Sequence, residues 1–164
     1  MARDPAFKYV EAVDTTPLPS DIPDVPEVGA TSAPLKSASY FIGARCQPYN
    51  DDFMLCRKDA NGPADCLKEG RRVTRCAISV LDDINKNCLE EFRRHWQCLD
   101  QGNHRFYQCR PAERLLNKCV FDKLSLEKTI PGVPKDQQVH LKEKPHLRPQ
   151  FEDAASVAAE KAAR

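Results

Sequence analysis

Hydrophobic residues gather in the middle of the chain, between residues 38 and 124, where their spacing fits helices separated by turns with proline or glycine. The first predicted helix covers residues 38–45 and is interrupted near Pro48, since proline lacks the amide hydrogen that a helix interior requires. Pro48 can serve as the first residue of the next helix, which carries residues 51–58. This stretch therefore predicts two short helices that meet at a proline.

Three further helical stretches follow. Residues 59–63 form the first predicted turn, and a helix then covers residues 64–81. The next stretch is free of glycine and proline as far as Gly102, so this helix is expected to continue into another one, with a bend near residues 82–87. After a turn at Gly102, a last helix covers residues 111–124. The sequence therefore predicts an all-α fold.

Placed side by side, these helices form two hairpins in tandem, residues 38–82 and residues 83–124. Each hairpin is too small to bury enough apolar surface to be stable by itself. The side chains expected in the first hairpin core are Phe53, Met54, Leu67, Val73, Ile78, Val80 and Leu81, and those in the second are Leu89, Phe92, Trp96, Leu99, Phe106, Leu115, Leu116 and Phe121.

The two ends of the chain differ from this middle part. Residues 1–37 hold six prolines, so they are expected to form either an extended arm on another protein's surface or a disordered tail. Residues 125–164 begin as a second proline-rich arm, and their alanine-rich end favours a short terminal helix. The apolar stripe of that helix would consist of Phe151, Ala155, Ala158 and Ala162; the alternative is a frayed, solvated helix.

The cysteines show the clearest pattern, because all eight fall into pairs with nine residues between the members: Cys46/Cys56, Cys66/Cys76, Cys88/Cys98 and Cys109/Cys119. Ten residues of helix cover about 15 Å, whereas a disulfide requires Cα atoms about 5.5–6 Å apart. The members of a pair therefore cannot bond within one helix, but antiparallel helices bring outer cysteine against outer and inner against inner. Among about 105 connectivities, this geometry favours Cys46–Cys76, Cys56–Cys66, Cys88–Cys119 and Cys98–Cys109.

Other uses of the cysteines fit the spacing less well. Structural zinc sites use cysteines about two to four residues apart, and thioredoxin-like sites use Cys-x-x-Cys; the chain has neither. His95 lies one turn before Cys98, but two ligands do not make a metal site, and a surface histidine beside a bridged cysteine is the favoured interpretation. No metal site is expected, and two bridges per hairpin, at about 2–4 kcal/mol each, are a sufficient explanation of the pattern.

The composition limits the cellular compartments in which the protein can be expected. The net charge of +1 does not favour nucleic acid as a partner, and no run of about 18 apolar residues predicts a membrane span. Eight cysteines in a small chain favour an oxidising compartment, yet the N-terminal sequence lacks the apolar segment of a secretory signal and is too acidic for a matrix transit peptide. The mitochondrial intermembrane space, where import can be coupled to thiol oxidation, fits these observations.

The segments around the cysteines carry a resemblance to a known family. CQPYNDDFMLC…CLKEGRRVTRC and CLEEFRRHWQC…CVFDKL resemble the twin Cx9C, or coiled-coil-helix-coiled-coil-helix (CHCH), family. Two consecutive units with proline-rich extensions are similar to the complex I accessory subunits of that family, over about residues 35–124. The resemblance implies a structural subunit without a cofactor, peripheral to the mitochondrial inner membrane on its intermembrane-space side. Its partners would be membrane-arm and other accessory subunits of complex I.

The resemblance also implies a partner during import, the disulfide-relay oxidoreductase of the intermembrane space. That relay recognises a cysteine with aromatic or aliphatic residues on one helical face. Tyr49 and Phe53 precede Cys56 by seven and three residues, and Phe92 follows Cys88 by four, so both sets are docking candidates. The other interpretation is that these aromatic residues belong to the hairpin core.

Three other function classes compete with a complex I subunit. An enzyme is not favoured, because the six glycines are scattered and the four histidines show no catalytic arrangement with serine or carboxylate residues. A copper chaperone needs thiols beyond the four bridged cysteines of each hairpin, and none are left over. The alternative that stays open is a CHCH assembly factor or membrane-organising protein of the intermembrane space.

Overall fold

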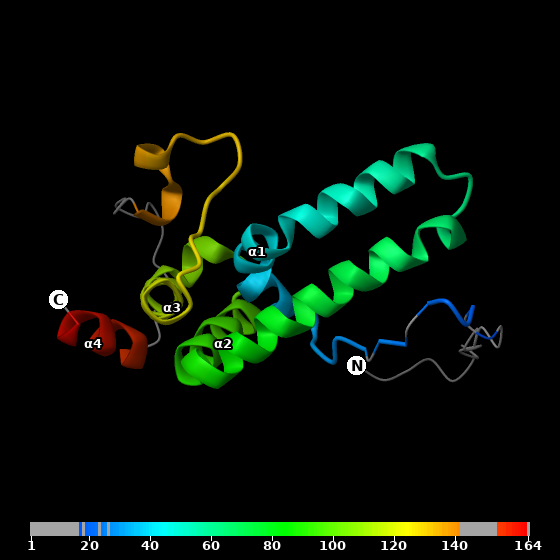
Figure 1. The fold of residues 1–164 in the computed structure, drawn as a ribbon. Helices are drawn as coiled ribbons and strands as arrows, with labels where there is room; N and C mark the ends of the chain where they lie inside the picture. Colours follow the sequence, from blue (N-terminus) through cyan, green and yellow to red (C-terminus); the bar gives the residue numbers. More distant parts are fainter. Residues whose placement is uncertain (1–16, 18, 23, 26, 142–153, 164) are drawn as a thin grey trace, which may run out of the picture.

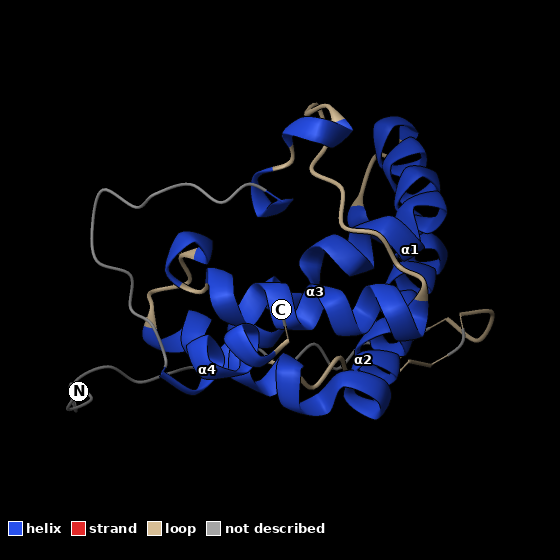
Figure 2. Ribbon diagram, turned by 90° about the vertical axis from the view of Figure 1, so that its left-hand side faces the viewer, coloured by secondary structure: helices blue, strands red, loops and turns tan. Residues whose placement is uncertain are grey.

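The computed structural model describes residues 17, 19–22, 24–25, 27–141 and 154–163, which form helices and loops (Figure 1). Figure 2 shows the same residues without a strand, so the predicted all-α fold is confirmed. None of the described helices is both long enough and apolar enough to cross a membrane. The α-helices are α1 (Ser32–Asp59), α2 (Leu67–Gln101), α3 (Arg110–Leu124) and α4 (Ala154–Ala162), and the 3-10 helices are η1 (Pro63–Cys66), η2 (Phe106–Gln108), η3 (Lys135–Gln137) and η4 (Val139–Leu141).

α1 is a single helix of 28 residues that continues through Pro48, so the predicted interruption is wrong. Pro48 removes the hydrogen bond to the carbonyl of Ala44. Both residues are exposed, and water can donate to that carbonyl instead. The Cys46–Cys76 disulfide holds the turn before Pro48 on α2, which favours continuation of the helix.

α1 also begins six residues before the predicted start at Ala38, so residues 32–37 are helical and not extended. Pro34 lies in the first turn, where the amide groups have no partner within the helix in any case. The additional turns bury Ala33 and Ser37. Packing against the rest of the protein therefore extends this helix beyond the point that proline content suggests.

α2 runs through both predicted hairpins. Cys88 has non-helical angles, with φ of −135° and ψ of 37°, so α2 bends there, one residue after the range predicted for the bend. The part before Cys88 lies antiparallel to α1, and the part after it packs against α3 (Figure 1). α3 covers nearly the range predicted for the last helix, residues 111–124.

One large hydrophobic core spans the two hairpins, and a smaller cluster of Cys98, Leu99 and Cys109 lies at the end of the second hairpin. The buried residues of the large core come from all three long helices and include Phe41 of α1, Ile84 and Phe92 of α2, and Leu116 of α3. Phe41 also meets Phe121 edge to face, with ring centroids 6.3 Å apart. The first part of α1 thus packs against the second hairpin as well as the first.

Two predicted core side chains are exposed: Met54 is 65% exposed and Leu89 is 42% exposed. No residue of α1 beyond Cys46 is buried. The distal end of the first hairpin is only two helices across, and two helices alone cannot enclose a large side chain. Its cohesion must therefore come from other contacts.

The described part of the N-terminal arm lies along the protein's own α2, whereas the sequence suggested either an arm on another protein's surface or a disordered tail. Ile22 is buried. Asp21 pairs with Lys68 at 2.6 Å, and Asp24 pairs with Arg71 at 3.7 Å. These acidic residues therefore bind the basic first turns of α2.

The C-terminal segment folds back over α3. The Gln138 side chain accepts a hydrogen bond from the Ile130 amide at 2.7 Å and donates one to the Val133 carbonyl at 2.7 Å. These bonds hold residues 130–138 as a compact loop. This part of the predicted extended arm is therefore folded.

The predicted terminal helix is present as α4, which contacts α3 through an ion pair between Arg114 and Glu160 at 2.6 Å. The predicted apolar stripe is wrong, because Ala155, Ala158 and Ala162 are exposed. Phe151 lies outside the described residues. A charged contact therefore positions α4 where an apolar one was expected.

Candidate functional site

Four disulfides join the helices, with Cα–Cα distances of 5.8 to 6.0 Å: Cys46–Cys76, Cys56–Cys66, Cys88–Cys119 and Cys98–Cys109. These are the pairs that the hairpin geometry favoured. All eight cysteines lie in the described part of the chain, and none of them is free. Two bridges join helix to helix, and the other two close the hairpins beside the 3-10 turns η1 and η2.

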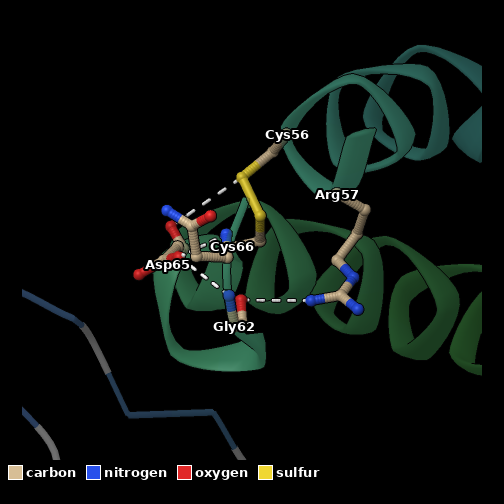
Figure 3. The surroundings of a disulfide bond; sticks show 6 residues. Cys56, Arg57, Gly62, Asp65 and Cys66 are labelled. Carbon is tan, nitrogen blue, oxygen red and sulfur yellow. Dashed lines mark hydrogen bonds between the residues drawn. A yellow bond between two sulfur atoms is a disulfide. The ribbon is translucent and has the colours of Figure 1, made fainter. Parts of the chain in front are cut away.

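The turn at the end of the first hairpin is built around its bridge, as Figure 3 shows. The Asp65 carboxylate accepts hydrogen bonds from the amides of Asn61 at 3.1 Å and Gly62 at 3.0 Å. Arg57 donates to the Gly62 carbonyl at 3.1 Å. Polar contacts and the Cys56–Cys66 bridge therefore hold the end of the hairpin that has no buried α1 side chain.

A cluster of charged side chains lies in the interior, where α1, α2, α3 and the segment after α3 meet. Glu113, with a side chain only 1% exposed, pairs with both Lys128 and Arg110. The Lys128 ammonium also lies over two rings, 4.6 Å from the centroid of Tyr40 and 5.1 Å from that of Phe106. Glu113, Lys128 and Arg110 form what we call the buried charged cluster.

A buried serine–histidine pair adjoins this cluster. His95 is 0% exposed and Ser37 is 2% exposed, and Ser37 Oγ lies 2.7 Å from His95 Nδ1 in a hydrogen bond. The His95 Nε2 atom has no hydrogen-bond partner among the described residues. The prediction of a surface histidine is therefore wrong. His95 faces the first turns of α1, which the sequence did not predict to be helical.

The charges of these groups follow from burial and from their neighbours. Burial lowers the pKa of His95 to about 4, although Glu113 acts in the opposite direction. Burial raises the pKa of Glu113, but Lys128 and Arg110 outweigh burial and hold this pKa below its ordinary value. Burial lowers the pKa of Lys128 against the attraction of Glu113. At neutral pH the interior thus contains a neutral histidine beside a carboxylate with two cationic partners.

Serine, histidine and glutamate are residue types of nucleophilic catalysis, but here they are closed to solvent. Ser37, His95 and Glu113 are each at least 98% buried, so a substrate has no open path to them. Among the described residues, no group of three or more histidine, cysteine, aspartate or glutamate side chains is placed to hold a metal ion. The arrangement supports a cohesive role, in which Glu113 and Lys128 tie the C-terminal segment to the helices.

We expect the stability of the protein to fall between pH 6.5 and pH 4 because of His95. In this window the unfolded chain binds a proton at residue 95 and the folded chain does not, since the folded pKa is about 4 against an ordinary 6.5. The free energy of unfolding should drop by up to about 3 kcal/mol over the window and be unaffected by this group at higher pH. Urea denaturation at a series of pH values measures this change.

The matched variants for this pH dependence are His95→Asn and His104→Asn. His104→Asn makes the same exchange of side chains at a half-buried position outside the core and is the control for loss of an imidazole. His95→Asn should flatten the slope of stability against pH. An unchanged slope in His95→Asn would show that other groups cause the acid sensitivity.

Known proteins share much of this sequence. No family model matches the chain. The chain is 60% identical over 144 residues to the NADH-ubiquinone oxidoreductase 20.8 kDa subunit of Neurospora crassa, a match that covers 86% of this chain and 79% of that protein. The chain belongs to the family of this 20.8 kDa subunit.

Plant relatives of the 20.8 kDa subunit family match more distantly. The NADH dehydrogenase [ubiquinone] 1 alpha subcomplex subunits 8-A and 8-B of Arabidopsis thaliana are 35% and 36% identical to the chain, each over 88 residues. These matches cover 54% of this chain and 82% and 83% of the plant proteins. The resemblance to complex I subunits that the cysteine segments suggested is therefore confirmed.

In this member of the 20.8 kDa subunit family, the two sets of import-docking candidates lie in different surroundings. Tyr49 is 42% exposed, and Phe53 is half-buried against Gly70. Cys88 and Phe92 are 1% and 3% exposed, so they belong to the common core. Only the first set is open to a partner once the chain has folded.

Proposed function

We propose that this chain is a non-catalytic structural subunit of mitochondrial NADH:ubiquinone oxidoreductase (complex I), bound to the intermembrane-space face of its membrane arm. The observation that carries the proposal is the 60% identity to the Neurospora crassa 20.8 kDa subunit across 79% of that protein. Identity of this degree over most of a chain supports conservation of the assembly in which the chain works.

Two structural features support the proposed compartment and role. All eight cysteines are bridged, and persistent disulfides require an oxidising compartment such as the intermembrane space. The serine, histidine and carboxylate groups are enclosed and serve the packing of the chain. The protein is thus suited to brace its neighbours, and the proposed role requires no redox group of its own.

Native gel electrophoresis of mitochondrial membranes tests this function. A tagged chain should migrate with the band that carries NADH dehydrogenase activity, and protease added to mitoplasts with an intact inner membrane should digest it. Loss of the chain should lower the amount of complete complex I. Migration with partial assemblies only would favour a CHCH assembly factor, and migration apart from complex I would reject the subunit proposal.

We also propose that the intermembrane-space disulfide relay oxidises this chain during import, through Tyr49, Phe53 and Cys56. In α1 the three residues recur at intervals of four and three, which places them along one stripe. Cys88 and Phe92 would serve as a second docking point only before folding encloses them. The first stripe is therefore the one that a mutation can test without disturbing the core.

The double variant Tyr49→Ala/Phe53→Ala should form at least about tenfold less mixed disulfide between Cys56 and the relay enzyme, since each aromatic side chain buried on docking contributes about 1.5–3 kcal/mol. Non-reducing gels of chain trapped during import into isolated mitochondria measure this species. Met54→Ala/Leu55→Ala is the matched control, because both side chains are exposed on the same helix away from the stripe. Equal loss in the two double variants would contradict docking through the stripe.

A further inference from the structure

α2 opens with a dense series of basic residues, two of which already bind carboxylates. Lys68 and Arg71, three residues apart, pair with Asp21 and Asp24, which are also three residues apart, at 2.6 and 3.7 Å. An acidic segment of this chain thus lies on one row of α2. The next row holds Arg72 and Arg75, again three residues apart.

Arg72 and Arg75 face a hollow of about 430 Å³ between α1 and α2. The other residues that line it are Arg45 and Tyr49 of α1, and Cys76 and Ser79 of α2. Arg45 is paired with Asp83 at 2.5 Å. By contrast, Arg72 and Arg75 are exposed and have no acidic partner among the described residues.

We propose that this hollow, the arginine groove, binds an acidic peptide segment of a neighbouring subunit; this inference rests on the proposed function as a complex I subunit. Guanidinium groups bind carboxylates in a two-pronged geometry. The Tyr49 hydroxyl can donate a further hydrogen bond to such a segment, whereas the Ser79 hydroxyl already donates to the Cys76 carbonyl at 2.8 Å. Two arginines three residues apart repeat the spacing with which α2 already holds Asp21 and Asp24.

The lining of the groove favours a peptide over a phospholipid. A lipid would bring acyl chains that need an apolar wall beside the phosphate site. The groove offers three arginines, a tyrosine, a serine and one bridged cysteine. An extended acidic peptide needs only the charged and polar groups that are present.

Site-specific photo-crosslinking in the assembled complex tests the occupant. A photoreactive amino acid at Ser79, which lines the groove, should crosslink to a segment of another subunit rich in aspartate or glutamate. The same amino acid at Lys86, an exposed position of α2 outside the groove lining, should not label that segment. Labelling of lipid alone, of a second copy of this chain or of its own N-terminal segment would each overturn the proposal.

Charge reversal tests whether the contact contributes to binding. Arg72→Glu/Arg75→Glu should reduce the amount of chain retained in complex I at least about tenfold at physiological salt, since glutamate side chains would repel an acidic segment that the arginines attract. The variant Arg72→Lys/Arg75→Lys keeps the charge but loses the two-pronged geometry, so its loss of binding should be smaller than that of the reversed variant. Lys58→Glu/Lys86→Glu, with the same change in net charge at exposed positions, should behave as the unmodified chain.

Replacement of the crosslinked acidic residues by lysine should restore the binding of the reversed variant. Normal retention of Arg72→Glu/Arg75→Glu in complex I would overturn the groove proposal while leaving the subunit proposal intact. Absence of the unmodified chain from complex I would instead overturn the proposed function. A non-reducing gel that shows four intact bridges in each variant separates loss of binding from loss of folding.

Discussion

Replacement of Glu113 by glutamine should lower the free energy of unfolding by about 3–5 kcal/mol, which is the cost of leaving a buried charge without its partner. Glu113 is the acceptor for both Lys128 and Arg110. Lys128 is itself only 6% exposed, so its charge cannot turn to water unless the C-terminal segment detaches. Guanidinium denaturation at neutral pH with the disulfides intact measures the loss.

Two further variants show whether the unpaired charge is the cause. Glu127→Gln makes the same chemical change at an exposed position and should alter the unfolding free energy by less than about 0.5 kcal/mol. Glu113→Gln/Lys128→Met removes the stranded ammonium and should recover part of the loss, since buried ion pairs can be replaced by apolar groups at little cost. A double variant less stable than Glu113→Gln would contradict this explanation.

The features that sequence reasoning predicted well depend on local spacing. The interval of nine residues between cysteines restricts which sulfurs can meet across an antiparallel pair of helices. The glycine at position 102 and the proline at position 111 similarly bound the end of α2 and the start of α3. Such signals act within a few turns of helix and need no knowledge of the rest of the fold.

The features that it missed arise from contacts between distant residues. α1 begins at Ser32 because its first turns pack on the second hairpin, where Ser37 meets His95 across 58 positions of sequence. The Glu113–Lys128 pair likewise joins a helix to a proline-rich tail. From the sequence alone, Lys128 cannot be distinguished from a solvated lysine in a polar tail. Its partner becomes evident only once the tail folds back.

For the import candidates and the arginine groove, the sequence supplies one part of the evidence and the structure supplies the other. The sequence identifies Tyr49 and Phe53 by their spacing before Cys56 but cannot separate docking from core packing. The structure leaves Tyr49 42% exposed and places it in the lining of the groove, as it does Arg75. The basic run at the start of α2 is visible in the sequence, whereas the pairing of one of its rows with Asp21 and Asp24 is not.

Removing one bridge at a time should show that a bridge in the core and a bridge at the distal end stabilise different parts of the protein. Cys88→Ser/Cys119→Ser opens a bridge between residues 31 positions apart and should cost about 4 kcal/mol of unfolding free energy. Both cysteines lie in the common core, so amide hydrogen exchange should become faster throughout the three long helices. Cys56→Ser/Cys66→Ser opens a bridge spanning 10 positions and should cost about 3 kcal/mol.

The second variant should show its effect mainly near the distal turn, because α1 has no buried residue beyond Cys46 that couples this end to the core. Exchange should become faster around residues 50–73 and stay slow around Phe92 and Leu116. Both variants should lower the abundance of the chain in mitochondria while leaving electron transfer per assembled complex I unchanged. Normal abundance with reduced electron transfer would instead indicate a redox role for the bridges, and uniform acceleration of exchange in Cys56→Ser/Cys66→Ser would show that the distal end unfolds together with the core.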